Sequence, residues 1–212
     1  MALGTYGPPR ELDIGRCFNE AIEVYKKNFL PLFLAAILFD VLSVLTLLVL
    51  SGPLAGGICL MTLKALRQRD RAVELGDLFG TFGKFLPLLE LFFLTFVLEL
   101  VGLGCLVLPG LFLMTIWLYP FYLMIDQEFG VFASLGASKD IVFRNGFWKN
   151  GGLLLIVVAL HLAPQLVPGV GIVLAWFVAP VSWLIVASAY LQQIPAAESG
   201  LGDLREAMQA SE

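Results

Sequence analysis

The chain has 212 residues and a formal net charge of −4 at pH 7; 59% of its residues are hydrophobic and 14% are charged. Soluble domains carry about 25% charged residues, so the composition excludes an ordinary soluble domain and favours an integral membrane protein. We expect a single membrane domain at residues 11–194, with no room for a separate catalytic domain.

The beginning of the chain combines a loose end with an amphipathic segment. Residues 1–10 contain two glycines and two prolines and no apolar core, so we expect a flexible N-terminus and not a signal peptide. In residues 11–29, apolar side chains recur at helical spacing among charged ones, which predicts an amphipathic helix. Such a helix lies either in the membrane interface, the interpretation we favour, or against a protein partner.

Two apolar segments follow this helix. Residues 30–50 contain a single charge, Asp40, and at about 1.5 Å per residue they are long enough to cross a hydrocarbon core of about 30 Å. Ser51-Gly52-Pro53 predicts a turn, and residues 53–66 return as a shorter segment. The glycines at positions 52 and 56, spaced G-x-x-x-G, predict close packing against another helix.

The most apolar stretch is residues 86–125, which contain no Lys or Arg and turn at Pro109-Gly110. We interpret this stretch as a transmembrane helical hairpin. Amphipathic segments precede and follow this hairpin, at residues 67–84 and 126–150. Two further apolar segments, residues 153–166 and 170–194, lead to a polar, acidic, cytoplasmic tail at residues 195–212. The return segments 53–66, 111–125 and 153–166 are short, and each either crosses the bilayer fully or is re-entrant.

An internal repeat organises these segments. Phe29-Leu30-Pro31-Leu32 recurs as Phe85-Leu86-Pro87-Leu88, each time where an apolar segment follows an amphipathic one. We therefore predict an all-α, polytopic membrane protein with six transmembrane helices as three hairpins, each preceded by an amphipathic interfacial helix. The approximate repeats are residues 11–66, 72–125 and 129–194.

The positions of the basic residues predict the orientation in the membrane. All 13 Lys and Arg residues lie before the first span, in the connections between spans two and three and spans four and five, or in the tail. The turns at residues 51–53, 102–110 and 164–171 contain none. By the positive-inside rule, we expect a multi-pass protein of the bacterial inner (plasma) membrane with both termini in the cytoplasm.

One group of basic residues is a candidate for contact with lipid headgroups. Lys64, Arg67, Arg69 and Arg71 lie close together around the connection between spans two and three. They could bind anionic headgroups, although the positive-inside rule alone also explains them. Acidic residues outnumber basic ones in the chain, so we expect no nucleic-acid partner.

Three polar residues fall near the middle of predicted spans: Asp40, Glu99 and His161. Because charge is costly at that depth, such residues usually face the interior of a helix bundle. They form either hydrogen bonds between packed helices or a relay for protons or a solute. A single histidine and the absence of C-x-x-C spacing predict no metal site, and we expect no cofactor.

Several short motifs carry a resemblance to a known family. They are Leu12-Asp13-Ile14-Gly15-Arg16, Tyr25-Lys26-Lys27-Asn28-Phe29, Asp77-Leu78-Phe79, Leu108-Pro109-Gly110, residues 119–126, Ala137-Ser138, Trp148-Lys149 and Ala189-Tyr190. Across residues 11–192, the chain resembles the membrane domain fused to some bacterial glycerophosphodiester phosphodiesterases and its stand-alone relatives. The resemblance implies a six-helix membrane fold. It does not imply the phosphodiesterase activity, because the catalytic domain is missing from this sequence.

Three functions are compatible with these features. The first, which we favour, is a non-enzymatic membrane protein that binds lipid or a partner membrane protein. The second is a small transporter or channel that uses the intramembrane acidic residues. The third is a membrane enzyme that acts on lipid headgroups at the inner face, with candidate residues Asp126, Glu128, Asp140, Arg144 and Asn145. The ligand and the oligomeric state are left open.

Overall fold

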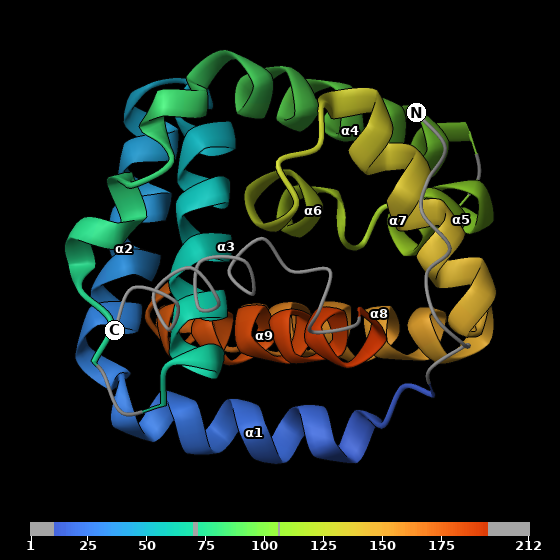
Figure 1. Ribbon diagram of the computed structural model, residues 1–212. Coiled ribbons are helices and arrows are strands. Elements are labelled where there is room, and N and C mark those ends of the chain that lie inside the picture. The colour runs from blue at the N-terminus through green and yellow to red at the C-terminus, as the bar shows by residue number, and fades with distance from the viewer. Residues whose placement is uncertain (1–10, 70–71, 106, 195–212) are drawn as a thin grey trace, which may run out of the picture.

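The computed structural model describes residues 11–69, 72–105 and 107–194, and every regular element in these ranges is a helix (Figure 1). The all-α prediction is confirmed. The elements are α1 (Ile14–Lys27), α2 (Phe29–Leu45), α3 (Ser51–Arg67), η1 (Leu75–Phe79), η2 (Phe82–Lys84), α4 (Phe85–Cys105), α5 (Val107–Ile116), α6 (Pro120–Asp126), α7 (Val131–Asn145), α8 (Phe147–Leu162), η3 (Ala163–Leu166) and α9 (Gly171–Gln193). The predicted N-terminus at residues 1–10 and tail at residues 195–212 lie outside the described residues.

Long apolar helices are the main feature of the structure. Four stretches are long and apolar enough to cross a membrane: Leu75–Gly104, Val107–Asp126, Phe147–Leu166 and Gly171–Gln193. The pair α1 and α2, bent by 96°, raises the number to five if it is taken as one span. The chain therefore has the helices of a membrane protein, whereas six spans and three transmembrane hairpins stay predictions.

Two turns lie earlier in the chain than predicted, because the glycines and prolines assigned to them belong to the first turns of α3 and α5. Residues 46–50 form the turn between α2 and α3, and the predicted turn residues Ser51, Gly52 and Pro53 open α3. Pro109 likewise lies in the first turn of α5. Proline is tolerated there because the first N–H groups of a helix have no partner within the helix. The two Phe-Leu-Pro-Leu repeats occupy the same place, since they open α2 and α4.

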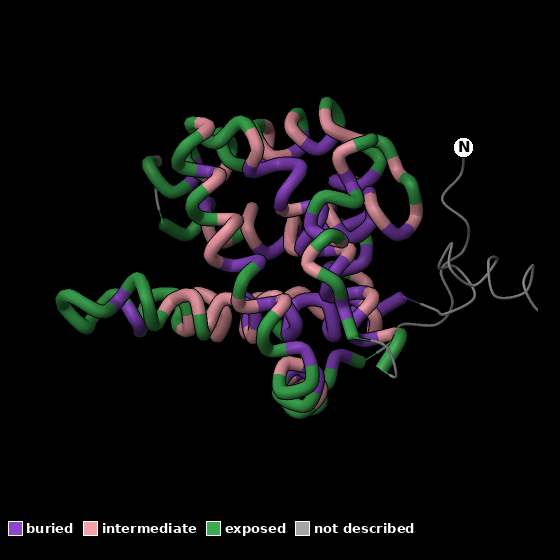
Figure 2. The backbone as a smooth tube through the Cα atoms, turned by 90° about the vertical axis from the view of Figure 1, so that its left-hand side faces the viewer, coloured by how far each residue is buried: buried purple, intermediate pink, exposed green. Residues whose placement is uncertain are grey.

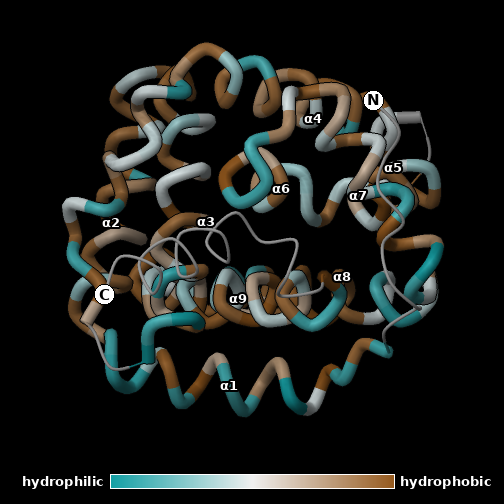
Figure 3. The backbone as a smooth tube through the Cα atoms, in the orientation of Figure 1, coloured by the Kyte–Doolittle hydropathy of each residue, from teal (hydrophilic) through white to brown (hydrophobic). Residues whose placement is uncertain are grey.

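The first helix, α1, packs its apolar face on protein. Asp13 caps it by accepting a hydrogen bond from the backbone N–H of Arg16 at 3.0 Å. Polar and apolar residues alternate along α1 (Figure 3), and the apolar Cys17, Ala21 and Val24 are buried. Because α1 contacts α9 and α3, this burial favours the alternative of packing on protein over an apolar face left open to lipid.

The core is centred on α3, most of whose residues are buried. Gly52 brings α3 against the backbone of α4, where an added Cβ would lie 2.4 Å from the carbonyl oxygen of Leu88. Gly57 does the same against η1, at 1.8 Å from the carbonyl oxygen of Leu78. The predicted close packing at Gly52 is thus confirmed.

Exposed residues gather where the long helices leave this core. In Figure 2, the pair α8 and α9 extends beyond the rest of the chain and is largely exposed there. The pair can be identified by its height in the view, which is the same as in Figure 1. Large exposed apolar side chains also lie on α2 and α4. The helices thus share one buried centre and leave apolar surface on the outside.

Candidate functional site

Charged residues from segments distant in sequence form ion pairs with one another. Five of the ion pairs that join them are Lys149–Glu11, Lys64–Asp77, Arg67–Asp126, Arg69–Glu20 and Lys84–Glu128. Residues 46–50 and 163–170, in the connections between α2 and α3 and between α8 and α9, contain no charged residue. We refer to the part of the molecule that holds these five pairs as the charged end.

The most buried of these pairs joins Arg67 at the end of α3 to Asp126 at the end of α6. The two guanidinium Nη atoms donate to the two carboxylate oxygens at 2.6 and 2.9 Å. Tyr190 of α9 donates its hydroxyl to the same carboxylate at 2.9 Å, and Gln127 donates its amide at 3.1 Å. The Asp126 side chain is only 1% exposed. A charge buried so deeply is tolerated because all these donors satisfy it.

A second, uncharged network lies beside the buried ion pair. Tyr119 donates its hydroxyl to the amide oxygen of Asn150 at 2.6 Å. Gln193 of α9 donates to that hydroxyl at 2.8 Å and to the same amide oxygen at 3.0 Å. All three residues are fully buried. Mutually satisfied hydrogen bonds of this kind fix the relative positions of helices, so we interpret this network as structural.

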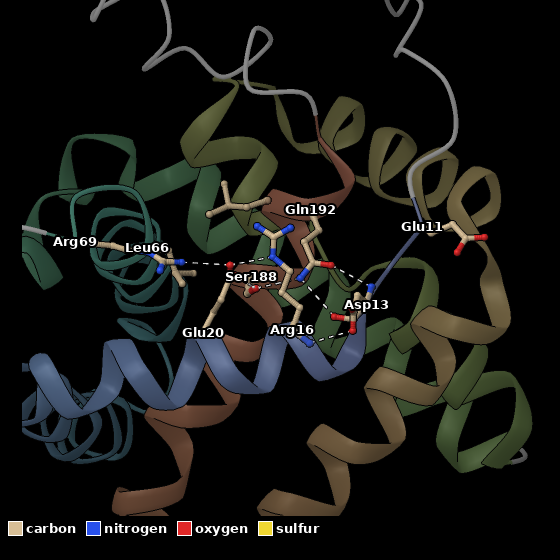
Figure 4. A pocket seen from close by; sticks show the side chains of 9 residues that line it. Glu11, Asp13, Arg16, Glu20, Leu66, Arg69, Ser188 and Gln192 are labelled. Carbon is tan, nitrogen blue, oxygen red and sulfur yellow. Dashed lines mark hydrogen bonds and ion pairs between the residues drawn. The ribbon is translucent and has the colours of Figure 1, made fainter.

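A cavity of about 500 Å³ opens at the charged end between α1, the end of α9 and the residues that follow α3 (Figure 4). It is lined by Glu11, Asp13, Arg16, Glu20, Leu66, Arg69, Ser188, Leu191 and Gln192. We refer to it as the α1–α9 pocket. It is the feature of the charged end best suited to hold a small polar ligand, because charged side chains of both signs surround an open space.

Glu20 is the centre of the hydrogen bonds in the α1–α9 pocket. Its carboxylate accepts from Ser188 at 2.7 Å, from Nε of Arg16 at 3.0 Å and from Nη2 of Arg69 at 3.2 Å. Burial alone would raise the pKa of the Glu20 carboxyl, but the hydrogen bond from Ser188 and the two arginines lower it below its ordinary value. Glu20 is therefore an anion that holds two guanidinium groups beside the pocket.

The predicted intramembrane residues are not joined to one another in the part of the chain that the structure describes. Asp40 is exposed on α2 and accepts a hydrogen bond from the indole N–H of Trp176 at 2.8 Å. Nδ1 of His161 lies 2.9 Å from the carbonyl oxygen of Val157 in its own helix. Glu99 is half-buried on α4. A role for them in a relay stays a prediction.

The predicted headgroup residues are engaged with acids. Lys64 pairs with Asp77 and borders a smaller cavity of about 220 Å³. Arg67 belongs to the buried pair, whereas Arg69 lines the α1–α9 pocket. Arg71 lies outside the described residues. Arg69 is thus the member of this group with direct access to the larger cavity.

The candidates for an enzymatic role lie in different surroundings. Asp126 is held in the buried pair, Glu128 is exposed beside Lys84, and Asp140 is exposed on α7. Asn145 is buried, with its amide nitrogen 3.5 Å from the backbone oxygen of Gln193, and Arg144 precedes it on α7. In the described ranges no group of three or more His, Cys, Asp or Glu side chains could hold a metal ion.

Polar residues near the end of α9 were missed by sequence reasoning. Ser188, Tyr190, Gln192 and Gln193 each take part in one of the networks or line the α1–α9 pocket. Tyr190 belongs to the short Ala189-Tyr190 motif, which assigns it no role, and the other three are single polar residues that no motif marks. The signal that could have found them is the spacing of Ser188 and Gln192, which places both on one helix face.

Comparison with protein-family models, with curated proteins and with solved structures gives no match to this chain. The resemblance to the membrane domain of phosphodiesterases therefore stays a prediction that rests on short motifs. The apolar helix surface and the charged end are the features from which a function can be inferred.

Proposed function

We propose that the chain is a non-enzymatic, multi-pass membrane protein that binds membrane lipid at its charged end. The observation that carries this proposal is the separation of two surfaces. Large apolar side chains are exposed along α2, α4, α8 and α9, whereas the ion pairs join residues 11–27, the end of α3, the connections that follow α3 and α6, and the start of α8. Such a separation matches a bilayer, with its hydrocarbon core next to a charged headgroup layer.

The exposed apolar surface supports contact with lipid tails. Val44 and Leu45 at the end of α2 are 74% and 75% exposed, and Leu86 on α4 is 73% exposed. Monomeric soluble proteins rarely expose large contiguous apolar patches. Since these helices satisfy their own backbone hydrogen bonds, they can place this surface in hydrocarbon at no polar cost.

A hydrogen bond at the charged end supports placing both ends of the six-span arrangement on one side of the membrane. The spans would be α2, α3, α4, the pair α5 and α6, α8, and α9. The backbone N–H of Asp13 donates to Oε1 of Gln192 at 3.0 Å, so the residues just before α1 meet the end of α9. Because this contact lies where the basic residues gather, the cytoplasmic side of the inner membrane is the expected location for both ends.

The pairing of charges favours binding over catalysis. Asp126 is held by Arg67, Tyr190 and Gln127, and Glu20 is held by Arg16, Arg69 and Ser188. A general acid or base has to exchange a proton with a substrate, which partners of this strength oppose. Guanidinium groups with free N–H donors, in contrast, suit the recognition of phosphate groups.

The test is whether the purified protein retains lipid. The chain is extracted from bacterial membranes in mild detergent, washed extensively, and analysed by native mass spectrometry. We expect phospholipid to remain bound at a defined stoichiometry. A protein free of lipid would overturn the proposal. A stoichiometric membrane protein in place of lipid would favour the partner alternative, and solute or proton flux into liposomes above that of empty liposomes would favour transport.

A further inference from the structure

The α1–α9 pocket is lined by charges of both signs. Arg16 and Arg69 provide two positive groups, and Glu11, Asp13 and Glu20 provide three negative ones. A simple anion gains little from such a mixture, because the acids repel it. A ligand that carries a positive and a negative group at once can pair with both sets.

The guanidinium group of Arg16 offers free donors to such a ligand. Its Nε binds Glu20, while its terminal nitrogens donate no hydrogen bond within the described ranges. Figure 4 shows this group reaching from α1 toward the space between Ser188 and Gln192. The planar fork of a guanidinium matches two oxygens of a phosphate group. Arg69, which pairs with Glu20 and at 3.7 Å with Glu23, adds a second positive charge from the opposite side.

The acids at the other edge of the pocket suit a positive group. Glu11 is 92% exposed, and its Oε2 lies 3.4 Å from the ammonium group of Lys149. Asp13 uses Oδ1 to cap α1 and keeps its second carboxylate oxygen for another donor. Figure 4 shows Glu11 and Arg69 at opposite ends of the pocket, with Asp13 near the acidic end. Glu20 is already paired with both arginines, and the remaining two acids, Glu11 and Asp13, lie away from Arg69, as the ammonium and phosphate groups of a zwitterion lie apart.

We propose that the α1–α9 pocket binds the phosphate and ammonium groups of phosphoethanolamine, presented by a zwitterionic phospholipid. Arg16 and Arg69 contact the phosphate, and Asp13 and Glu11 contact the ammonium. Leu66 and Leu191 in the lining give the pocket an apolar wall. This inference rests on the proposed function, because it names the lipid class and the site. Free phosphoethanolamine has the same chemistry, so the experiment separates the two sources.

The experiment compares matched variants in nanodiscs that contain phosphatidylethanolamine and phosphatidylglycerol in equal amounts. Retained lipid is counted by native mass spectrometry. We expect the unmodified chain to retain phosphatidylethanolamine preferentially. Arg16→Gln should lower its retention about tenfold, because charge-assisted hydrogen bonds to the phosphate are lost. Arg16 is exposed, with 64% of its side chain accessible, so this variant should fold.

Two further variants separate the pocket from general effects of charge. Asp13→Asn keeps a good helix cap but removes the carboxylate, so it should abolish the preference for phosphatidylethanolamine over phosphatidylglycerol while phosphate binding remains. Lys26→Gln removes a charge from the same helix outside the pocket and should behave like the unmodified chain. A second arm titrates free O-phosphoethanolamine into the protein in detergent.

Each outcome decides between the two proposals. Lipid retention that is equal in the unmodified chain and in Arg16→Gln would overturn the pocket and leave the lipid-binding function standing. Binding of free O-phosphoethanolamine that depends on Arg16, without retained lipid, would support the pocket and overturn the lipid source. Loss of both lipids from the protein, together with no binding of free O-phosphoethanolamine, would overturn both proposals.

Discussion

Arg67 and Asp126 form an ion pair whose two charges are both removed from water. The exposed fractions of their side chains are 17% and 1%. Attraction in such a pair is offset by the loss of hydration, so its net contribution to stability is small. Removing one partner is different, because the other charge stays buried without a counterion. The pair therefore makes the junction of α3 and α6 sensitive to single substitutions.

We predict that Arg67→Met lowers the stability by about 3 kcal/mol, the cost of leaving a buried carboxylate unpaired. The combined variant Arg67→Met, Asp126→Leu and Tyr190→Phe should regain most of this loss, because it removes the charge and the hydroxyl that donates to it. Thermal unfolding of the purified variants in one detergent measures both effects. A combined variant no more stable than Arg67→Met would show that the pair stabilises the fold by itself.

The control is an ion pair on the surface. Lys84 and Glu128 lie 3.0 Å apart, but their side chains are 39% and 80% exposed. Exposed pairs contribute about 0.2–1 kcal/mol, since water screens them and both side chains lose freedom. Lys84→Met should therefore leave the unfolding temperature almost unchanged under the same conditions. A loss as large as that of Arg67→Met would contradict the role of burial.

At the scale of elements, glycines set how closely α3 approaches its neighbours. Gly57→Ala would place a Cβ 1.8 Å from the backbone oxygen of Leu78, and a backbone atom cannot rotate away. We predict a loss of about 1–3 kcal/mol or more, as η1 is pushed off α3. The midpoint of thermal unfolding measures this loss, and full native stability would rule out the close contact.

A glycine with open surroundings provides the matched control. Gly136 lies inside α7, and nothing lies within 4 Å of an added Cβ. Alanine is the better helix former by about 1 kcal/mol, so Gly136→Ala should leave the protein equally stable or more stable. The two substitutions add the same methyl group, and their opposite signs would show that the surroundings decide the effect.

The sequence was sufficient for the helices but not for where they begin or for the polar networks. Apolar runs of spanning length predict helices reliably, and the segments around Asp40 and Glu99 are helical as expected. Pro53 was assigned to a turn, although it lies in the first turn of α3. Position alone does not separate a proline in a turn from one that opens a helix, because its fixed φ suits both.

The candidate site depended on contacts that are distant in sequence. Arg67 was identified because it belongs to a basic cluster, but its partner Asp126 is 59 positions away. Tyr119 and Gln193 are 74 positions apart and share a hydrogen bond. No motif contains both residues, so their meeting follows only from how α9 packs on the other helices. Periodicity describes single elements and carries no such information.

At the scale of the whole molecule, the distribution of basic residues along the chain predicts which turns face outward. Under the six-span arrangement, the turn between α2 and α3, the start of α5 and the turn between α8 and α9 all lie outside the cell. Leu47, Val107 and Leu166 represent these places and are 84%, 64% and 82% exposed. Glu128 and Lys139 are exposed on the cytoplasmic side of the same arrangement.

Single cysteines at these five positions, in a background without Cys17, Cys59 and Cys105, test the arrangement directly. An impermeant thiol reagent added to intact cells should label positions 47, 107 and 166, and should reach positions 128 and 139 only after the membrane is permeabilised. The reason is the cost of moving charged connections across the bilayer, which keeps basic segments inside. Labelling of position 128 or 139 in intact cells would contradict the orientation. If position 47 alone were protected while positions 107 and 166 were labelled, α2 and α3 would not cross the membrane. The remaining spans would keep their orientation, because the basic connection before α4 is cytoplasmic whether or not α2 and α3 cross.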